Sequence, residues 1–290
     1  MAEEAWARWG KDDQRGALNH IGPEQVRRAA ALVKSGEIVM LAQPISDAMK
    51  IPAHRPRPVH FMGRDGGDYA AGARRPGGFQ FAEDTIILPL HAGTHIDCLC
   101  HAWYGDALYN GHPGESVRSG GALRCGAETM GAIVSRGILL DVVAIKGRPL
   151  DDGEIIGAAL LQQAIDKAKV RLEKGDVVLV RTGWMERNEG NKAPDFFREP
   201  GLDVEAGLLL AKADVAVVGA DNYAIEVLPF PAETVFPVHQ RLMRDVGVPL
   251  LEGLVLAPLA AKGVSEFLFV AAALPIVGAT ASPLAPIAVL

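Results

Sequence analysis

The strongest constraint on the fold is a pair of continuous apolar runs, Gly137–Val143 (GILLDVV) and Asp176–Arg181 (DVVLVR). Such runs are typical of strands that are buried on both faces of a sheet. A helical stretch near Ile155–Leu172 separates them, and a helix over Val204–Ala213 precedes another apolar strand at Val215–Val218. Strands that alternate with helices predict an α/β fold with a largely parallel or mixed sheet.

The first ninety residues add a helix, two strands and a long connection. Pro23 begins a run with helical spacing, and Ile38–Leu41 and Ile86–Leu90 are expected strands. Residues 52–80 are rich in Pro, Gly and Arg and predict an irregular loop of the kind that forms lids or pocket walls. Its basic residues could meet an anionic substrate, but we favour a solvated loop. Because no linker or repeat divides the chain, we expect one domain over residues 1–290.

Composition narrows the class of protein. The net charge is −6 and the basic residues are scattered, which argues against a nucleic-acid-binding surface. Three cysteines without regular spacing suit a reducing compartment. The first residues, MAEEAWARWGKDD, contain no apolar segment of a signal peptide, so we expect a cytoplasmic protein.

The C-terminal stretch Phe267–Leu290 contains no charged residue and is long enough to cross a bilayer. However, Pro275, Pro283 and Pro286 interrupt it, and a bilayer offers no partner for the backbone groups that three prolines free. We therefore predict buried strands and turns here, and no contact with a membrane.

A histidine cluster in the segment HAGTHIDCLCH carries the chemistry. Because His91, His95, Asp97 and His101 share parity, their side chains would point to one side of an extended chain, whereas a helix would spread them apart. In a straight strand His91 and His95 would lie about 13 Å apart, so the chain must bend, and Gly93 permits this. Two imidazoles and a carboxylate then predict an open, catalytic metal site.

Two other interpretations of the cluster remain. Its side chains could be ordinary hydrogen-bonded residues, although burying them without an ion costs several kcal/mol. A structural metal would usually recruit four ligands, cysteines among them. Cys98 and Cys100 have the opposite parity, so we expect them to face away as small buried apolar residues.

The segment resembles the His-x-Gly-Thr-His-x-Asp-x-x-x-His signature of the cyclase, or kynurenine formamidase-like, family of metal hydrolases, which includes isatin hydrolase. The stretch Thr94–Gly111 looks like the longer branch of that family, as do RTGW at Arg181–Trp184, ADNYAIE at Ala220–Glu226 and the C-terminal LPIVGATASPLAPIAV. Leu99 stands where the formamidase form commonly has proline, which weakens an assignment to kynurenine formamidase itself.

The resemblance implies an α/β domain of the swivelling β/β/α type that assembles as a homodimer or homotetramer. It also implies His91, His95 and Asp97 as primary metal ligands and His101 as the catalytic histidine. Members with two metals recruit a distant histidine and glutamate, which here match His239 and Glu252. Glu252 interrupts the apolar run VPLLEGLVL, where a carboxylate favours a nearby cation.

These observations predict a metal-dependent hydrolase that opens a cyclic amide or lactone, or cleaves an N-formyl amide, with metal-activated water and His101 as acid and base. The alternatives are a metal-dependent cyclase or lyase, and a metal-binding protein without turnover. Imidazole ligands suit Zn²⁺, while a carboxylate and waters suit Mn²⁺, and the sequence does not choose between them.

Residues around the substrate are harder to predict. Thr94 is a candidate to hold a metal ligand in place. Aromatic side chains could wall a pocket for a flat carbonyl substrate, although each alone is more often part of the core: Trp103, Tyr104, Tyr109 and Trp184. The polar residues Asp221, Asn222 and Glu226 either line the site or form a solvated turn, and Asn222 is retained as a candidate.

Overall fold

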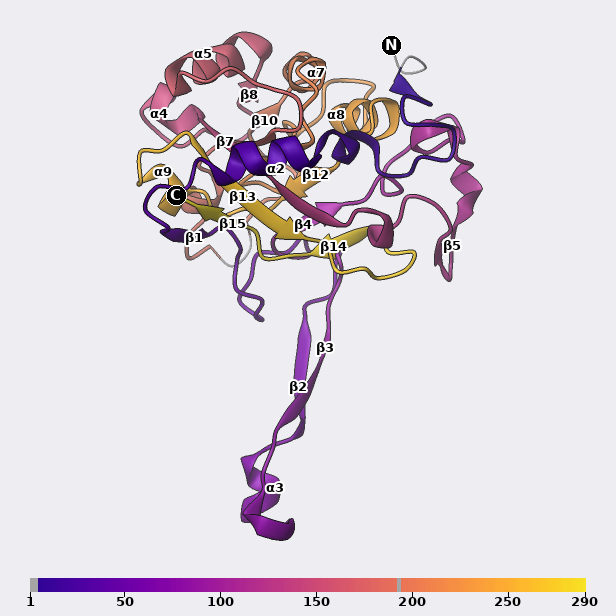
Figure 1. Ribbon diagram of the computed structural model, residues 1–290, viewed down its shortest axis with the longest axis vertical. Helices are drawn as coiled ribbons and strands as arrows, with labels where there is room; N and C mark the ends of the chain where they lie inside the picture. The colour runs from indigo at the N-terminus through magenta and orange to yellow at the C-terminus, as the bar shows by residue number, and fades with distance from the viewer. Residues whose placement is uncertain (1–4, 192–193) are drawn as a thin grey trace.

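A mixed sheet of nine strands forms the centre of the protein (Figure 1). The computed structural model describes residues 5–191 and 194–290. In spatial order the strands are β1 (Ile38–Met40), β15 (Ile287–Val289), β13 (Glu266–Ala272), β7 (Ala132–Asp141), β9 (Val177–Arg181), β11 (Val217–Ala220), β12 (Leu250–Glu252), β4 (His95–Asp97) and β14 (Ala281–Pro283). The four strands from β7 to β12 run parallel, and the outer pairs are antiparallel. The predicted α/β fold with a mixed sheet is therefore confirmed.

Helices cover this sheet. α2 (Pro23–Ala30) packs against β7 and β13, α5 (Ala158–Ala168) packs against β7, and α4 (Val142–Lys146) packs against β9. α7 (Val204–Lys212) lies against α5. The other helices are short: η1 (Gly16–His20), η3 (Tyr109–Gly111), η4 (Gly114–Ser116), η5 (Ala127–Thr129), α6 (Trp184–Arg187), α8 (Pro237–His239), the π-helix η6 (Gln240–Asp245) and α9 (Ala257–Ala260). Two small pairs of strands complete the body: β5 (Val117–Arg118) with β6 (Gly121–Ala122), and β8 (Ile155–Ile156) with β10 (Gly201–Leu202).

The apolar runs form the strands that the sequence predicts, with shifted ends. β7 ends at Asp141 because the Asp141 carboxylate accepts a hydrogen bond from the Ala144 amide and so begins α4. Ile155 and Ile156 belong to β8 rather than to the following helix, which starts after Gly157. The strand expected at Val215–Val218 runs from Val217 to Ala220.

The prediction of an irregular loop over residues 52–80 is wrong. β2 (Val59–Arg64) and β3 (Glu83–Ile87) pair in antiparallel fashion and, with α3 (Gly66–Ala70) and η2 (Pro76–Gly78), project from the body as a long arm (Figure 1). The strand expected at Ile86–Leu90 ends at Ile87. Val59, Phe61 and their partners favour a strand, while the Asp65 carboxylate caps α3 at the tip of the arm.

The charge-free C-terminal stretch is folded into the sheet as β13, β14 and β15, as its prolines predict. Within the described ranges, no helix is both long enough and apolar enough to cross a bilayer.

Candidate metal centre

The site is built where β4 lies between β12 and β14. In the register of the sheet, His95 is directly opposite Glu252 of β12 and Pro283 of β14, and Asp97 is opposite Leu250. Directly opposed residues on neighbouring strands point to the same side, so the side chains of His95 and Glu252 lie together. His95, Asp97 and Glu252 are all buried.

The chain bends before β4, as predicted. Gly93 has a φ of +63°, a conformation that glycine adopts without strain. A Cβ atom at this position would lie 2.5 Å from Cε of Met49, so the space is also restricted. The bend brings the ring centroids of His91 and His95 to 5.3 Å from each other, instead of about 13 Å in a straight strand.

His101 reaches the cluster by a different route from the predicted one. The extended chain ends at Asp97, and a turn follows in which the His101 amide donates a hydrogen bond to the Cys98 carbonyl (2.8 Å). The expectation that shared parity would carry His101 to the site is therefore wrong, because the backbone is no longer extended there. The turn still places the His101 ring 4.1 Å from that of His91. Cys98 and Cys100 are buried, as expected.

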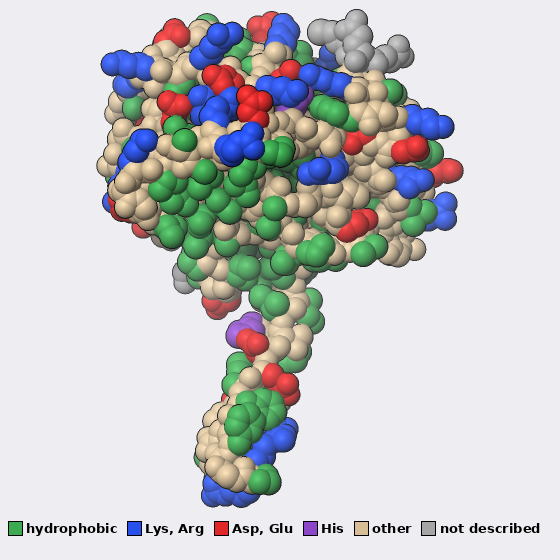
Figure 2. Space-filling model, in the orientation of Figure 1, with side chains coloured by type: hydrophobic (Ala, Val, Ile, Leu, Met, Phe, Trp, Pro, Cys, Tyr) green, Lys and Arg blue, Asp and Glu red, His purple; other side chains and the backbone are tan. Residues whose placement is uncertain are grey.

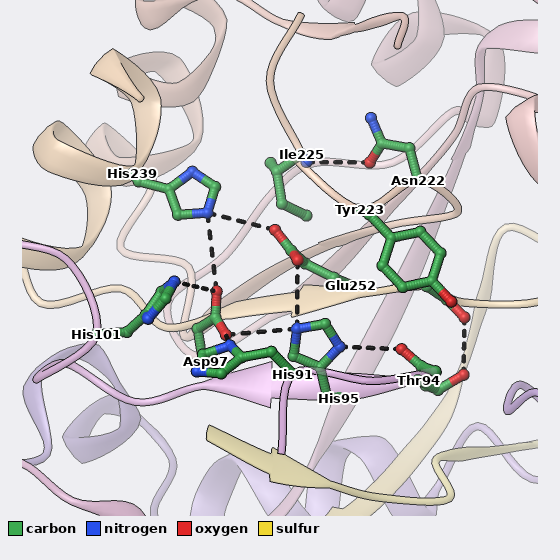
Figure 3. A network of polar contacts seen from close by, with 12 residues as sticks. His91, Thr94, His95, Asp97, His101, Asn222, Tyr223, Ile225, His239 and Glu252 are labelled. Atoms are coloured by element: carbon green, nitrogen blue, oxygen red, sulfur yellow. Dashed lines mark hydrogen bonds and ion pairs between the residues drawn. The ribbon is translucent and has the colours of Figure 1, made fainter. Parts of the chain in front are cut away.

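Asp97 is the centre of the cluster (Figure 3). Its Oδ1 lies 2.7 Å from Nδ1 of His91 and 3.5 Å from Nε2 of His95. Its Oδ2 lies 3.8 Å from Nε2 of His101 and 3.7 Å from Nε2 of His239. Glu252 bridges two of these rings, with 3.3 Å from Oε2 to His95 Nε2 and 3.3 Å from Oε1 to His239 Nε2.

The atoms that face one another here lack ordinary partners. Within the described part of the chain, five buried atoms of the cluster make no hydrogen bond of acceptable geometry: His91 Nδ1, His95 Nε2, Asp97 Oδ1 and Oδ2, and Glu252 Oε1. Among the described residues, the carboxylates of Asp97 and Glu252 form ion pairs with histidine alone, and with no lysine or arginine. Buried carboxylates of this kind need a cation, and imidazole and carboxylate are the ligands of Zn²⁺ and Mn²⁺. The donor set therefore fits a divalent metal.

Two overlapping sets of side chains have ligand atoms within 4.8 Å of one another. One is His91, Asp97 and His101, and the other is His95, Asp97 and Glu252. Because Asp97 belongs to both, the arrangement suits a single ion or two ions that share one carboxylate.

Hydrogen bonds behind the rings direct the free nitrogens toward this centre. His91 Nε2 lies 3.0 Å from Oγ1 of Thr280, and His95 Nδ1 lies 2.9 Å from the Gly93 carbonyl. A ring nitrogen that donates to such a partner leaves the other nitrogen unprotonated and free to bind a metal.

The electrostatics reflect this crowding. Burial alone would raise the pKa of Asp97, but His101 and His91 hold it well below its ordinary value. Burial lowers the pKa of the His101 imidazole to about 4. For His239, burial acts to lower the pKa, but hydrogen bonds to Glu226 and Glu252 outweigh it and raise the pKa to about 10.

Comparison with known proteins identifies the family. The sequence model of the Cyclase family matches residues 39–227, and a solved structure described as a novel cyclase is 38% identical, with a TM-score of 0.91 over 98% of this chain and 99% of that chain. The chain belongs to the Cyclase family. No curated protein matches it.

Structures at lower identity share the fold of this Cyclase-family chain. An isatin hydrolase A from Ralstonia solanacearum is 19% identical, with a TM-score of 0.64 over 87% of this chain and 91% of that chain. An isatin hydrolase bound to the product analogue thioisatinate is 18% identical, with a TM-score of 0.66 over 93% of this chain and 99% of that chain. The family resemblance inferred from the histidine segment is thus confirmed.

His239 and Glu252, which the Cyclase-family resemblance implied, both lie in the cluster. His239 ends α8 and is buried beside Glu226, whose Oε1 lies 2.6 Å from His239 Nδ1. Glu226 also accepts hydrogen bonds from the amides of Val238 and His239, each at 3.0 Å. Glu226, which the sequence left undecided, is therefore the residue that orients His239.

Thr94 supports the backbone of the site rather than a ring. Its hydroxyl donates to the Gly253 carbonyl (2.7 Å) and accepts from the Gln43 amide (2.9 Å), which ties the strand before Asp97 to the residue after Glu252. Tyr223, which sequence reasoning missed, lies beside this link. Its ring centroid is 6.3 Å from that of His95, and its hydroxyl accepts from Gln43 Nε2.

The other candidates lie in different surroundings. Trp184 is buried against Phe196 and Tyr223. The Asn222 side chain donates to the Pro200 carbonyl and accepts from the Ile225 amide, so it holds a turn. Tyr104 donates to Asp245 under the Arg244 guanidinium, and Trp103 is exposed beside Gly114. Tyr109 is buried and donates to Asp13. Asp221 accepts from the amides of Thr182 and Gly183 and so braces the RTGW segment. The roles of Trp103, Tyr104, Trp184 and Asn222 toward a substrate stay predictions.

Proposed function

We propose that this protein is a metal-dependent hydrolase that cleaves a C–N or C–O bond next to a carbonyl group, with a cyclic amide as the first candidate substrate. The observation that carries the proposal is the set of buried, unpartnered nitrogen and oxygen atoms around Asp97. Burying them costs several kcal/mol unless a cation joins them.

In this proposal His91, His95 and Asp97 would hold the metal, and His239 and Glu252 would complete the site. A divalent metal bound there would supply Lewis acidity to polarise a carbonyl oxygen and to lower the pKa of water toward neutrality. Glu226, Thr280 and the Gly93 carbonyl keep the imidazoles of His239, His91 and His95 in fixed orientations. Zn²⁺ and Mn²⁺ both suit these ligands.

His101 is assigned the proton transfer. Its side chain is 31% exposed, against 15% for His91, 4% for His239 and 0% for His95. A part-exposed imidazole beside the metal ligands can accept a proton from the attacking water and pass it to the leaving group, which contributes about 10²–10⁴ in rate.

The substrate class rests on the similar structures. The isatin hydrolases named above act on a cyclic amide by their name, and one was solved with the product analogue thioisatinate. Their identity to this chain is below one fifth, so they support the proposed reaction only through the shared fold and the cluster. Lactones and N-formyl arylamines present a similar carbonyl and remain in the panel to be tested. We place this activity in the cytoplasm, because the three cysteines are free and thiols stay reduced in that compartment.

The decisive experiment measures metal and turnover together. The purified protein is analysed for metal, then assayed with Zn²⁺ or Mn²⁺ on isatin-like lactams, lactones and N-formyl arylamines, with product identity determined by mass spectrometry. We expect a ring-opened or deformylated carboxylate that disappears after chelation. A ring-closed or eliminated product would instead identify the cyclase or lyase, and metal binding without any product would identify a non-catalytic protein.

Two variants separate binding from chemistry. His95→Ala should lose most of the bound metal, since His95 is fully buried between Asp97 and Glu252. His101→Ala should keep the metal and lose about 10²–10⁴ in kcat. His60→Ala, an exposed histidine on the arm, is the matched control and should change neither property. Loss of metal in His101→Ala would show that His101 is a ligand, contrary to the role assigned here.

A further inference from the structure

One buried turn, from Asn222 to Glu226, is joined to both distant parts of the metal cluster. At its start, the Asn222 carbonyl accepts a hydrogen bond (2.7 Å) from the amide of Gly253, the residue directly after Glu252. At its end, the Glu226 carboxylate faces the ring of His239 and accepts a hydrogen bond from its amide. The separation of 3.3 Å between His239 Nε2 and Glu252 Oε1 therefore depends on the shape of this turn.

The turn is strained at Ile225. This residue is fully buried and has a φ of +56°, a conformation that is an outlier for a β-branched side chain. The Glu226 amide donates back to the Ala224 carbonyl, so the backbone closes a three-residue turn around Ile225. Such strain persists only where the surrounding contacts over-determine the conformation. The contacts that hold the turn are therefore part of what builds the metal cluster.

Side chains supply the first of these contacts. The Glu199 carboxyl group accepts a hydrogen bond (2.8 Å) from the Tyr223 amide inside the turn. The Asn222 side chain donates to the Pro200 carbonyl (2.7 Å) and accepts from the Ile225 amide (3.0 Å; Figure 3). Glu199 is fully buried, and its Oε1 has no hydrogen-bond partner within the described ranges. Burying a carboxyl group with an unpartnered oxygen costs folding free energy, so stability alone does not account for this residue.

Backbone packing against β10 supplies the second support. The Leu202 amide donates to the Ile225 carbonyl (2.9 Å), and the Leu202 carbonyl accepts from the Val227 amide (3.2 Å). Gly201 permits this close approach, because a Cβ atom there would lie 2.5 Å from the carbonyl oxygens of both Ile225 and Glu226. Backbone atoms cannot swing aside as the end of a flexible side chain can. A larger residue at position 201 must therefore displace the turn.

We propose that Glu199 and Gly201 are positioning residues of the metal centre, which set His239 against Glu252 by holding the turn at residues 222–226. Neither is one of the proposed ligands, and both belong to a segment outside β4, β12 and α8. Their role rests on the proposed metal-dependent function, because it is exerted through two of the metal ligands. Displacing the turn should move His239 away from Glu252 and weaken metal binding while every ligand is still present.

Competition with a chromophoric chelator measures the affinity of each variant for Zn²⁺ and Mn²⁺. Gly201→Ala displaces the turn, and Glu199→Leu leaves the Tyr223 amide without its acceptor, so each should bind metal about 10–100-fold more weakly. Glu199→Gln keeps an acceptor oxygen for that amide and should stay within about threefold of the wild type. Burial, with a smaller contribution from the charge of Glu252, raises the pKa of Glu199 well above its ordinary value. This favours the neutral form, whose charge glutamine matches.

Hydrogen exchange reports on the turn in the metal-free protein. The amides of Val238, His239 and Gly253 are all bonded to residues of the turn. In Gly201→Ala and Glu199→Leu these three amides should exchange at least about tenfold faster than in the wild type, because local opening breaks fewer contacts. Denaturant unfolding of the same proteins shows that each is folded and measures its global stability separately.

Two control variants separate positioning from general destabilisation. Gly137→Ala places a Cβ atom against the ring of Phe267 in β7, three strands away from β12, and should lower stability but not metal affinity. His60→Ala lies on the arm, which stands clear of the body over most of its length in Figure 2, and should change neither property.

Three results would count against these assignments. Metal affinity that falls as much in Gly137→Ala as in Gly201→Ala, or turn amides that exchange no faster than in the wild type, would overturn the positioning role. A Glu199→Gln variant that binds metal as weakly as Glu199→Leu would contradict the role of Glu199. A wild type that binds no metal would refute the proposed function, and the exchange of the three amides would then show by itself whether Glu199 and Gly201 hold the turn.

Discussion

Replacing Glu226 by glutamine should weaken metal binding without touching any proposed ligand. In the structure, Glu226 Oε1 accepts from the His239 amide and faces His239 Nδ1, while Oε2 accepts from the Val238 amide. Glutamine has one acceptor oxygen and one NH₂ group, so it cannot serve both sides. If its oxygen stays with His239, its NH₂ group meets the Val238 N–H, and a buried donor is left unsatisfied.

The size of the effect follows from those contacts. The unsatisfied donor costs about 1–3 kcal/mol of folding free energy. The second loss is the negative charge behind His239, which makes Nε2 a stronger ligand. Removing such a supporting carboxylate typically costs 10–100-fold in metal affinity, or about 1.4–2.7 kcal/mol. If the glutamine turns the other way, Nδ1 must accept, and Nε2 then carries the proton and cannot bind a metal at all.

Competition with a chromophoric chelator measures the metal affinity, and denaturant unfolding of the metal-free protein measures the packing loss separately. Asp203→Asn is the matched control, because Asp203 accepts from the Ala206 amide at the start of α7 and the same carboxylate-to-amide change occurs outside the cluster. A Glu226→Gln protein that binds metal as tightly as the wild type would refute the idea that Glu226 orients and activates His239.

Three further outcomes are expected. Gly93→Ala should cost about 1–2 kcal/mol of stability because of the positive φ at this position, and it should also weaken metal binding because the new Cβ would contact Met49. Gly36 also has a positive φ but lies in open space, so Gly36→Ala should lower stability and leave metal binding unchanged. Removing the metal by dialysis against a chelator should lower the unfolding free energy by about 2.7 kcal/mol relative to metal at 100 times Kd, measured as a shift in Tm; an unchanged Tm would argue against a metal in the folded state. Burial lowers the pKa of His20 to about 4, so as the pH falls the unfolded chain takes up this proton before the folded chain does. The free energy of unfolding should therefore decrease as the pH drops from about 6.5 to about 4. In denaturation experiments across this pH range, His20→Gln should reduce the dependence of stability on pH.

The central sheet was predictable because strands that are buried on both faces have continuous apolar sequences. Val177–Val180 and Ile138–Leu140 are continuous apolar runs, and both are fully enclosed in the parallel part of the sheet. Most of the arm escaped prediction for the opposite reason, and only the end of β3 falls within the strand expected at Ile86–Leu90. β2 is exposed on both faces, so it carries neither a continuous apolar run nor a clean alternation, and the Pro and Gly residues around it are typical of a loop.

The candidate site likewise has one part that the local sequence predicts and one part that depends on the fold. His91, His95 and Asp97 lie within seven residues, and the bend at Gly93 could be inferred because a straight strand cannot bring the two imidazoles together. His239 and Glu252 depend on strand order and on α8, and only the family resemblance connected them to the cluster. Glu226 gave a weaker signal: a carboxylate within an apolar stretch is either solvated or paired, and pairing requires the fold to be known.

The position of β4 in the sheet explains why one carboxylate can serve the whole centre. β4 is three residues long and lies between two antiparallel neighbours, so Asp97 is fixed from both sides while the chain is free to bend at Gly93 before it and to turn at Cys98 after it. The bend brings His91 back to Asp97 from the N-terminal side of β4, and the turn brings His101 back to it from the C-terminal side. β12 then adds Glu252, and α8 adds His239. A longer β4 would carry His91 and His101 away from Asp97 at about 3.3 Å per residue, so the shortness of the strand is what makes the cluster possible.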